Sequence, residues 1–190
     1  KPSVTKMIKM EDDNISPEGV MDLYGYLKDI SGLLYPKVKL EDLVTIPKEI
    51  TLDLDDMVLE LDKILNKKSE YGTKMYLLND KEKDLVYIEN LQREVNNGGF
   101  NQFYLNSSGN YAIETEKAYK KINAIRTLSI IEKANNKFPN KFIPSDREKR
   151  IEILLKIEND VESIWKKCND DFFKNDEYYF ESLYNYFISK

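Results

Sequence analysis

One short stretch of the chain places together residue types that could bind an anion. In Asn97-Gly98-Gly99-Phe100, two adjacent glycines follow an asparagine and precede an aromatic residue. Consecutive backbone N–H groups beside a helix start can form an anion-binding nest. This chemistry would make the chain a small-molecule or anion-binding protein, or an enzyme, with its site at residues 97–100, which we name the glycine corner.

The sequence around the glycine corner favours a structural role instead. No lysine or arginine lies between Arg93 and Lys117 to help hold a phosphate, and the corner lacks the glycine spacing and the Lys-Ser/Thr ending of a P-loop. Asn and Gly tolerate the left-handed backbone that ends helices, so we expect a helix to stop at Asn96 or Asn97. We favour a helix-to-helix corner whose aromatic residues pack in the core, and the anion site stays the alternative.

A group of carboxylates before the corner could also carry function. A helix would place Asp53, Asp56 and Glu60 on one face, because their spacing is i, i+3, i+7. Paired carboxylates can act as glycosidase catalysts or metal ligands, but the Asp/Asn-rich loop of an EF-hand is missing. Acids that favour a helix dipole, on a solvated face, are the simpler interpretation. Beside it we keep a candidate acidic interaction surface, the acidic cluster: Asp53, Asp55, Asp56, Glu60 and Asp62.

The residue types that are missing narrow the catalytic options. The 190 residues contain no histidine and a single cysteine, Cys168. Without histidine there is no catalytic triad, no Cys-His pair and no histidine-based metal site, and one cysteine excludes an internal disulfide. An enzyme would have to use carboxylates, Lys, Tyr or backbone groups. We therefore expect a non-enzymatic protein with no cofactor and no bound metal.

Charge is unevenly distributed along the chain. The formal net charge is −5, with 20 acidic and 14 basic residues in 1–95 but 14 acidic and 15 basic residues in 96–190. An acidic half disfavours direct binding of nucleic acid, because phosphate binding needs a basic face. A basic protein partner would suit it better.

Two further features concern surfaces. The last helix, expected from about Asp176, would carry aromatic residues on nearly all sides through four of the thirteen tyrosines: Tyr178, Tyr179, Tyr184 and Tyr186. Tyr is enriched at interfaces, so one interpretation is a surface for self-association or a partner, and the other is the periphery of the core.

Glu158 is the one charged residue on the apolar stripe of its helix. We expect it at the edge of that stripe, in contact with solvent.

Hydrophobic periodicity predicts the elements that must position these residues. Apolar residues recur at helical spacing through most of the chain after residue 50. Asn79 with Glu82, and Ser145 with Glu148, are typical of capping boxes that open two of the helices. The predicted architecture is all-α, an irregular bundle of about six or seven helices with a sharp Gly-Gly helix corner.

Composition also predicts the organisation and location of the chain. A segment with two prolines, 33–50, marks a boundary between an N-terminal appendage and connector over 1–50 and a helical domain over 51–190. No apolar run approaches the roughly 18 residues that span a bilayer, so we expect a soluble protein with no membrane partner. The chain begins with Lys1 and not with Met, which we interpret as trimming. We expect a cytoplasmic location without a secretory leader.

An ordered set of residues runs through the glycine corner: Glu94, Asn97, Gly98, Gly99, Phe100, Gln102, Phe103 and Tyr104, followed by Asn106 and Gly109. This set resembles the signature of a bacterial family, the DNA-mimic-protein-like domain of unknown function. The resemblance continues at Ile122-Asn123-Ala124, where the family commonly has Ile-Gly-Ala, and asparagine is the natural substitute at a left-handed position. It covers roughly residues 75–190.

The resemblance implies an all-α fold, in agreement with the periodicity. It also implies a homodimer whose acidic surface occupies the DNA-binding site of a transcription factor, because the member that names the family imitates duplex DNA. Such mimicry needs rows of carboxylates, comparable with one charge per about 1.7 Å of duplex, and only the acidic cluster is dense enough. We predict a non-enzymatic, regulatory interaction domain that binds a basic or DNA-binding protein through acidic and aromatic surface.

Overall fold

The computed structural model describes residues 54–188, which form six α-helices, three short 3₁₀-helices and no strand. The α-helices are α2 (Leu54–Lys68), α3 (Asp80–Leu105), α4 (Ala112–Lys121), α5 (Ile125–Asn135), α6 (Arg147–Lys174) and α7 (Tyr179–Ile188). The 3₁₀-helices are η2 (Met75–Leu77), η3 (Ser107–Tyr111) and η4 (Pro139–Lys141). The predicted all-α architecture is confirmed. The appendage and connector predicted over 1–50, and Asp53, lie outside the described residues.

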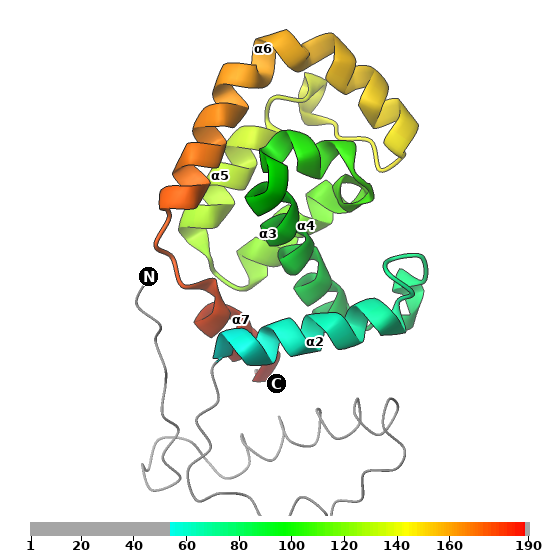
Figure 1. The fold of residues 1–190 in the computed structure, drawn as a ribbon, viewed down its shortest axis with the longest axis vertical. Coiled ribbons are helices and arrows are strands. Elements are labelled where there is room, and N and C mark those ends of the chain that lie inside the picture. The colour runs from blue at the N-terminus through cyan, green and yellow to red at the C-terminus, as the bar shows by residue number, and fades with distance from the viewer. Residues whose placement is uncertain (1–53, 189–190) are drawn as a thin grey trace, which may run out of the picture.

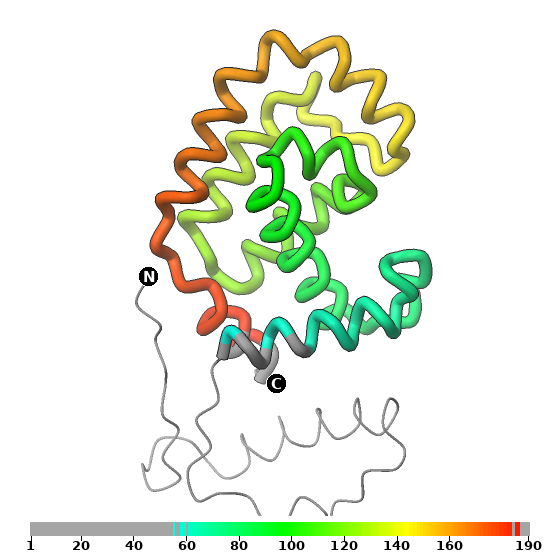
Figure 2. Tube along the Cα trace, in the orientation of Figure 1, coloured from blue at the N-terminus to red at the C-terminus, as the bar shows by residue number. Residues whose placement is uncertain are grey.

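Helix α3 is the centre of the described domain, and the other helices pack around it (Figure 1). Helices α4 and α6 pack directly on α3, and α5 packs on both α4 and α6. Helices α2 and α7 lie against each other at one end of the bundle, where α2 also contacts α3. Figure 2 shows the backbone leaving the end of α6 and returning to α2 through α7. The two ends of the described chain therefore meet at α2 and α7.

Side-chain caps fix where two of the helices begin. At α3, the Asn79 side chain accepts a hydrogen bond from the backbone N–H of Glu82 (3.0 Å), and the Glu82 carboxylate accepts one from the N–H of Asn79 (2.8 Å). This capping box confirms the prediction. At α6 the prediction of Ser145 as the N-cap is wrong. Asp146 is the N-cap, and its side chain accepts a hydrogen bond from the backbone N–H of Lys149 at 2.9 Å. Asp and Ser cap helices equally well, so the pattern does not distinguish them.

The apolar stripes of the helices form a core around α3. On α3 the buried side chains recur at helical spacing, at Leu85, Ile88, Leu91 and Val95. On α2 the buried stripe comprises Val58, Leu61 and Leu65. The free thiol of Cys168 on α6 is buried as well. Each large apolar side chain contributes about 1.5–3 kcal/mol by leaving water, so this burial drives the helices together.

Helices α4 and α5 meet at Asn123, whose φ of 57° is left-handed, as the resemblance implied. The N-cap residue of α5, Ala124, offers no side-chain cap. Its place is taken by Glu177, whose carboxylate accepts hydrogen bonds from the backbone N–H groups of Arg126 (3.0 Å) and Thr127 (2.8 Å). A residue from the segment before α7 thus caps α5 and ties the C-terminal end of the domain to it.

One boundary agrees with the prediction and another differs. Helical backbone in the first half of α3 ends at Asn97 and breaks at Gly98 and Gly99, as predicted. The final helix begins at Tyr179 and not near Asp176, because the preceding residues are engaged at the start of α5. No helix among residues 54–188 combines the length and apolarity that a bilayer crossing requires.

Candidate functional site

The glycine corner breaks α3 through the backbone of its two glycines. Gly98 has φ −155° and ψ 18°, and Gly99 has φ 76° and ψ −174°. The combination at Gly99 belongs to a region of backbone space that is essentially restricted to glycine. The positive φ therefore falls on Gly99, and the helical backbone before the break ends at Asn97.

The space beside the corner is occupied by a side chain of α6. A Cβ on Gly99 would lie 2.3 Å from Asn169 Nδ2. The backbone N–H of Phe100 donates a hydrogen bond to Asn169 Oδ1 at 2.9 Å. One of the N–H groups that could line an anion nest is thus already bonded within the protein.

The Glu94 carboxylate joins the two halves of α3 across the break. It accepts hydrogen bonds from Gln102 Nε2 and Asn106 Nδ2, each at 2.8 Å, and from Ser108 Oγ at 2.9 Å. Glu94 precedes the break and its three donors follow it, so this network fixes the angle between the halves. The Glu94 charge would also repel an anion placed at the corner.

The aromatic residues after the glycines are packed in the core. Phe100, Phe103 and Tyr104 are at most 1% exposed. The Tyr104 ring lies 5.0 Å from Trp165 and 4.9 Å from Phe138, measured between ring centroids. Aromatic pairs at such distances stabilise by about 0.5–1.5 kcal/mol beyond the area they bury. The structure thus shows the aromatic packing that the sequence favoured for this corner.

Arg150 on α6 is a buried cation that the sequence reasoning missed. Its side chain is fully buried and donates hydrogen bonds to the carbonyl oxygens of Tyr104 (2.7 Å), Pro144 (2.7 Å) and Asn106 (2.9 Å). It also donates to Asn110 Oδ1 at 2.8 Å. Several basic residues crowd the start of α6, and nothing in their pattern shows which one is buried. Through these hydrogen bonds, Arg150 links the segment after the glycine corner to α6.

Asp62 of the acidic cluster does not belong to an exposed surface. It is 4% exposed, and its carboxylate forms an ion pair with Arg93 of α3. Burial raises the pKa of Asp62, although the hydrogen bond and the charge of Arg93 oppose this. Asp62 therefore joins α2 to α3 inside the fold, and the expectation that it faces a partner is corrected.

The other members of the acidic cluster lie on or beside α2. Asp55 is half-buried and accepts a hydrogen bond from the Tyr178 hydroxyl at 2.5 Å, just before α7. Asp56 and Glu60 are one helical turn apart on α2, and their side chains are outside the described part of the structure. The acidic and the aromatic segments singled out in the sequence are thus neighbours in space.

A second buried group missed by the sequence reasoning is Glu89 of α3. It is 2% exposed, and the Tyr179 hydroxyl donates to its Oε1 at 2.9 Å. Burial raises the pKa of Glu89 to about 7, and the hydrogen bond offsets this only in part. This part of α3 is buried on all sides. The sequence pattern therefore does not separate a buried face from an exposed one, and it gives no sign that an acid here is buried. Glu158, the candidate from the sequence, is exposed as expected.

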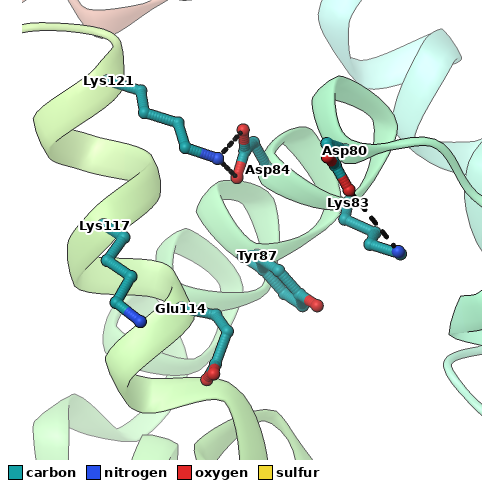
Figure 3. Close-up of a pocket in the computed structure, with 7 residues that line it drawn as sticks. All are labelled: Asp80, Lys83, Asp84, Tyr87, Glu114, Lys117 and Lys121. Carbon is teal, nitrogen blue, oxygen red and sulfur yellow. Dashed lines mark hydrogen bonds and ion pairs between the residues drawn. The ribbon is translucent and has the colours of Figure 1, made fainter.

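An open pocket of about 160 Å³ lies between α3 and α4 (Figure 3). Its lining is Asp80, Lys83, Asp84, Tyr87, Glu114, Lys117 and Lys121. Lys121 reaches from α4 to Asp84 on α3 at 2.7 Å. Equal numbers of acids and cations leave no net charge for an ionic ligand, so the pocket is best explained by ion pairing between the two helices. Among residues 54–188, no group of acids or cysteines is arranged to hold a metal ion.

The family model described as DMP19-like protein matches residues 77–190, which is more than half of the chain. The chain belongs to the DMP19-like protein family. This confirms the family predicted from the residues of the glycine corner. No curated protein and no solved structure matches the chain significantly.

The DMP19-like match begins beside the cap of α3 and extends through α7. It therefore includes the glycine corner, Asn169 and Arg150, and it leaves out α2 with the acidic cluster. In this DMP19-like domain the signature residues shape the bundle, since Glu94 and the buried aromatic side chains bond or pack within it.

Proposed function

We propose that this DMP19-like domain is a non-enzymatic, regulatory interaction domain that binds a DNA-binding protein through acidic and aromatic surface. Membership of a family named after a DNA mimic is the observation that carries the proposal. The glycine corner supports it, because its polar groups are used by Asn169, Gln102 and Asn106 within the fold. The signature residues of the glycine corner then have a structural role, and other surfaces of the domain bind the partner.

The end of the bundle formed by α2 and α7 suits such a partner (Figure 1). Residues 53–95 hold 11 acidic and 7 basic side chains. Helix α7 and the residue before it bring tyrosines to the same place, as the bond from Tyr178 to Asp55 shows. Carboxylates attract the Lys and Arg side chains with which DNA-binding proteins contact phosphate. Tyrosine adds contact area with a polar tip.

A competition experiment tests this function. The full chain is immobilised, presented with lysate of its source, and the captured proteins are challenged with duplex DNA. We expect DNA-binding proteins among those captured and their release by the duplex, because DNA and its mimic would share one site. Capture that duplex DNA leaves unchanged would contradict the proposal.

Charge variants locate the surface. The variant Asp53→Asn/Asp56→Asn/Glu60→Gln removes three charges near α2, and it spares Asp62 because that carboxylate pairs with Arg93 inside the fold. We expect it to lower the affinity for the partner at least tenfold. The matched control removes three exposed charges of α6: Glu158→Gln, Asp160→Asn and Glu162→Gln. Equal effects of the two variants would show that net charge, and not this surface, attracts the partner.

A further inference from the structure

The segment between α2 and α3, residues 69–78, presents large apolar side chains to solvent, and we name it the tyrosine loop. Tyr71 and Tyr76 are 77% and 74% exposed, and Leu77 is 46% exposed. Elsewhere among residues 54–188 the exposed large apolar side chains occur singly along the chain: Leu59, Ile125, Phe142, Leu155 and Phe173. Single exposed apolar side chains are ordinary on a protein surface, whereas a group of them indicates an interaction site.

Hydrogen bonds within the tyrosine loop hold Tyr71 away from the core. The backbone N–H of Tyr71 donates to the carbonyl oxygen of Asn66 at 2.7 Å, and that of Lys74 donates to the carbonyl oxygen of Ser69 at 2.8 Å. Tyr71 has a left-handed φ of 55°, which is uncommon for a bulky side chain. Leu78, at the end of the loop, is buried. The exposed side chains therefore belong to a well-bonded turn and not to a frayed helix end.

Positive charge surrounds the tyrosine loop. Residues 63–83 hold six lysines and three acids, a formal net charge of +3. The next acids along the chain, Asp62 and Asp84, have ion-pair partners on α3 and α4. Each of the three acids within the stretch pairs with one of its lysines: Glu70 with Lys74, Asp80 with Lys83 and Glu82 with Lys68. An occupant with apolar and acidic residues would suit this surface.

The chain itself contains a segment of the complementary kind. Residues 11–30 hold six acids and one lysine. Within them Ser16-Pro17-Glu18 is typical of a helix start. The apolar residues that follow recur at helical spacing: Val20, Leu23, Tyr24, Leu27 and Ile30. A helix over 17–30 would have a length that is marginal in water by itself, roughly 12–15 residues, so its apolar stripe needs a surface to pack on.

This segment precedes α2 closely enough to reach the tyrosine loop. The 23 residues from 31 to 53 can span up to about 75 Å. Helix α2 has 15 residues and is therefore about 22 Å long. The DMP19-like match begins at residue 77, so α2 and most of the tyrosine loop belong to the same N-terminal extension as residues 17–30. A contact within this extension would cover apolar side chains that the family domain leaves exposed.

We propose that residues 17–30 dock on the tyrosine loop of the same chain as an amphipathic helix, with the apolar stripe against Tyr71, Tyr76 and Leu77. The stripe and the loop then leave water together, and the acids of 11–30 lie near the lysines that surround the loop. The loop is at the end of α2 away from α7 (Figure 1). The acidic surface at the other end of α2 stays open to the partner of the proposed function, on which this inference does not depend.

Photocrosslinking of the full chain tests the contact. Benzoylphenylalanine replaces Tyr76, and its crosslinks are mapped by mass spectrometry in an equal mixture of unlabelled and isotope-labelled chains. We expect the main crosslink to join Tyr76's position to residues 17–30 of the same chain. The same group in place of Phe142, which is 65% exposed, should give no crosslink to 17–30. A main crosslink to another segment, no crosslink at all, or crosslinks of mixed isotope, which would identify a second copy as the occupant, would overturn the proposal.

Hydrogen exchange of variants tests which side chains make the contact. We expect the backbone amides of 17–30 to exchange at least about tenfold faster in Tyr71→Ser/Tyr76→Ser/Leu77→Ser than in the native chain, because their apolar surface is lost. The matched control, Phe142→Ser/Leu155→Ser/Phe173→Ser, removes three other exposed apolar side chains and should leave this exchange unchanged. Native exchange in α3 verifies that the loop variant is folded. Equal exchange of 17–30 in the native chain and the folded loop variant would overturn the proposal.

Discussion

The two glycines of the corner are constrained by different neighbours. Gly98 has an extended φ of −155°, and the atoms that crowd it belong to the flexible Gln102 side chain. Gly99 has a φ of 76° and is crowded by Asn169, which is held in place by its bond to Phe100. The backbone therefore requires glycine at the second position more strictly than at the first.

We predict that Gly99→Ala lowers the free energy of unfolding by roughly 3 kcal/mol or more, because backbone strain of about 1–3 kcal/mol adds to the clash with Asn169. Gly98→Ala should cost about 1 kcal/mol, the value of the displaced hydrogen bond from Gln102 to Glu94. Urea unfolding followed by the fluorescence of Trp165, the one tryptophan of the chain and 4% exposed, measures both. Equal losses at the two glycines would refute this ranking. In an Asn169→Gly background, Gly99→Ala should lower the free energy of unfolding only by the backbone strain, because the clash with Asn169 is absent.

At the scale of elements, the start of α5 depends on a distant carboxylate. Burial would raise the pKa of Glu177, but the hydrogen bonds from Thr127 and Arg126 outweigh it and lower the pKa below its ordinary value. A group with a lowered pKa stabilises the fold above its ordinary pKa and loses that effect as pH falls through the lowered value. The cap of α5 is therefore fully effective at neutral pH and weakens in acid.

We predict that Glu177→Gln lowers the free energy of unfolding at neutral pH by about 1–2 kcal/mol, the usual value of a charged helix cap. Hydrogen exchange should quicken in the first turn of α5 and throughout α7, since Glu177 ties the two together. The control is Glu132→Gln, an exposed acid on α5, which should change neither. An effect confined to α7 would contradict the role of Glu177 as a cap.

The sequence predicted the features that depend on near neighbours. The capping box at Asn79, the left-handed Asn123 and the break after residue 97 all follow from residue types within a few positions, and the structure shows each of them. Arg150, Glu89 and Glu177 each have a hydrogen-bond partner 40 or more positions away. No local pattern encodes such pairings, so the burial of Asp62 and Glu89 could not be predicted.

At the scale of the whole molecule, buried acids link stability to pH. The pKa of Glu89 rises to about 7 in the folded chain, from an ordinary 4.5, because of burial. The folded state then binds the proton more tightly than the unfolded state does. This contribution to stability is complete below the ordinary pKa and is lost as pH rises through about 7. The pKa of Asp62 is also raised by burial, so its contribution has the same sign.

We predict that Glu89→Gln flattens the pH dependence of unfolding between about pH 5 and pH 8. On account of Glu89 the native chain should lose about 3 kcal/mol over this interval, whereas glutamine keeps an oxygen for the Tyr179 hydroxyl and does not titrate. The variant should match the native chain near pH 5 and exceed it at pH 8 in urea unfolding. Glu158→Gln, at an exposed position, is the control. Parallel curves for the native chain and Glu89→Gln would contradict the raised pKa.

The cap that Glu177 supplies also governs the order in which the domain can be completed during synthesis. Glu177 follows the first turn of α5 by 50 residues, so the helix emerges from the ribosome long before its cap. Helices α3 to α6 can collapse in the meantime, but the first N–H groups of α5 stay uncapped until Glu177 has been made. A chain that stops early, or is cut just after α6, lacks the cap and α7 together. The segment from Glu177 through α7 thereby caps α5 only after the rest of the described domain has been made.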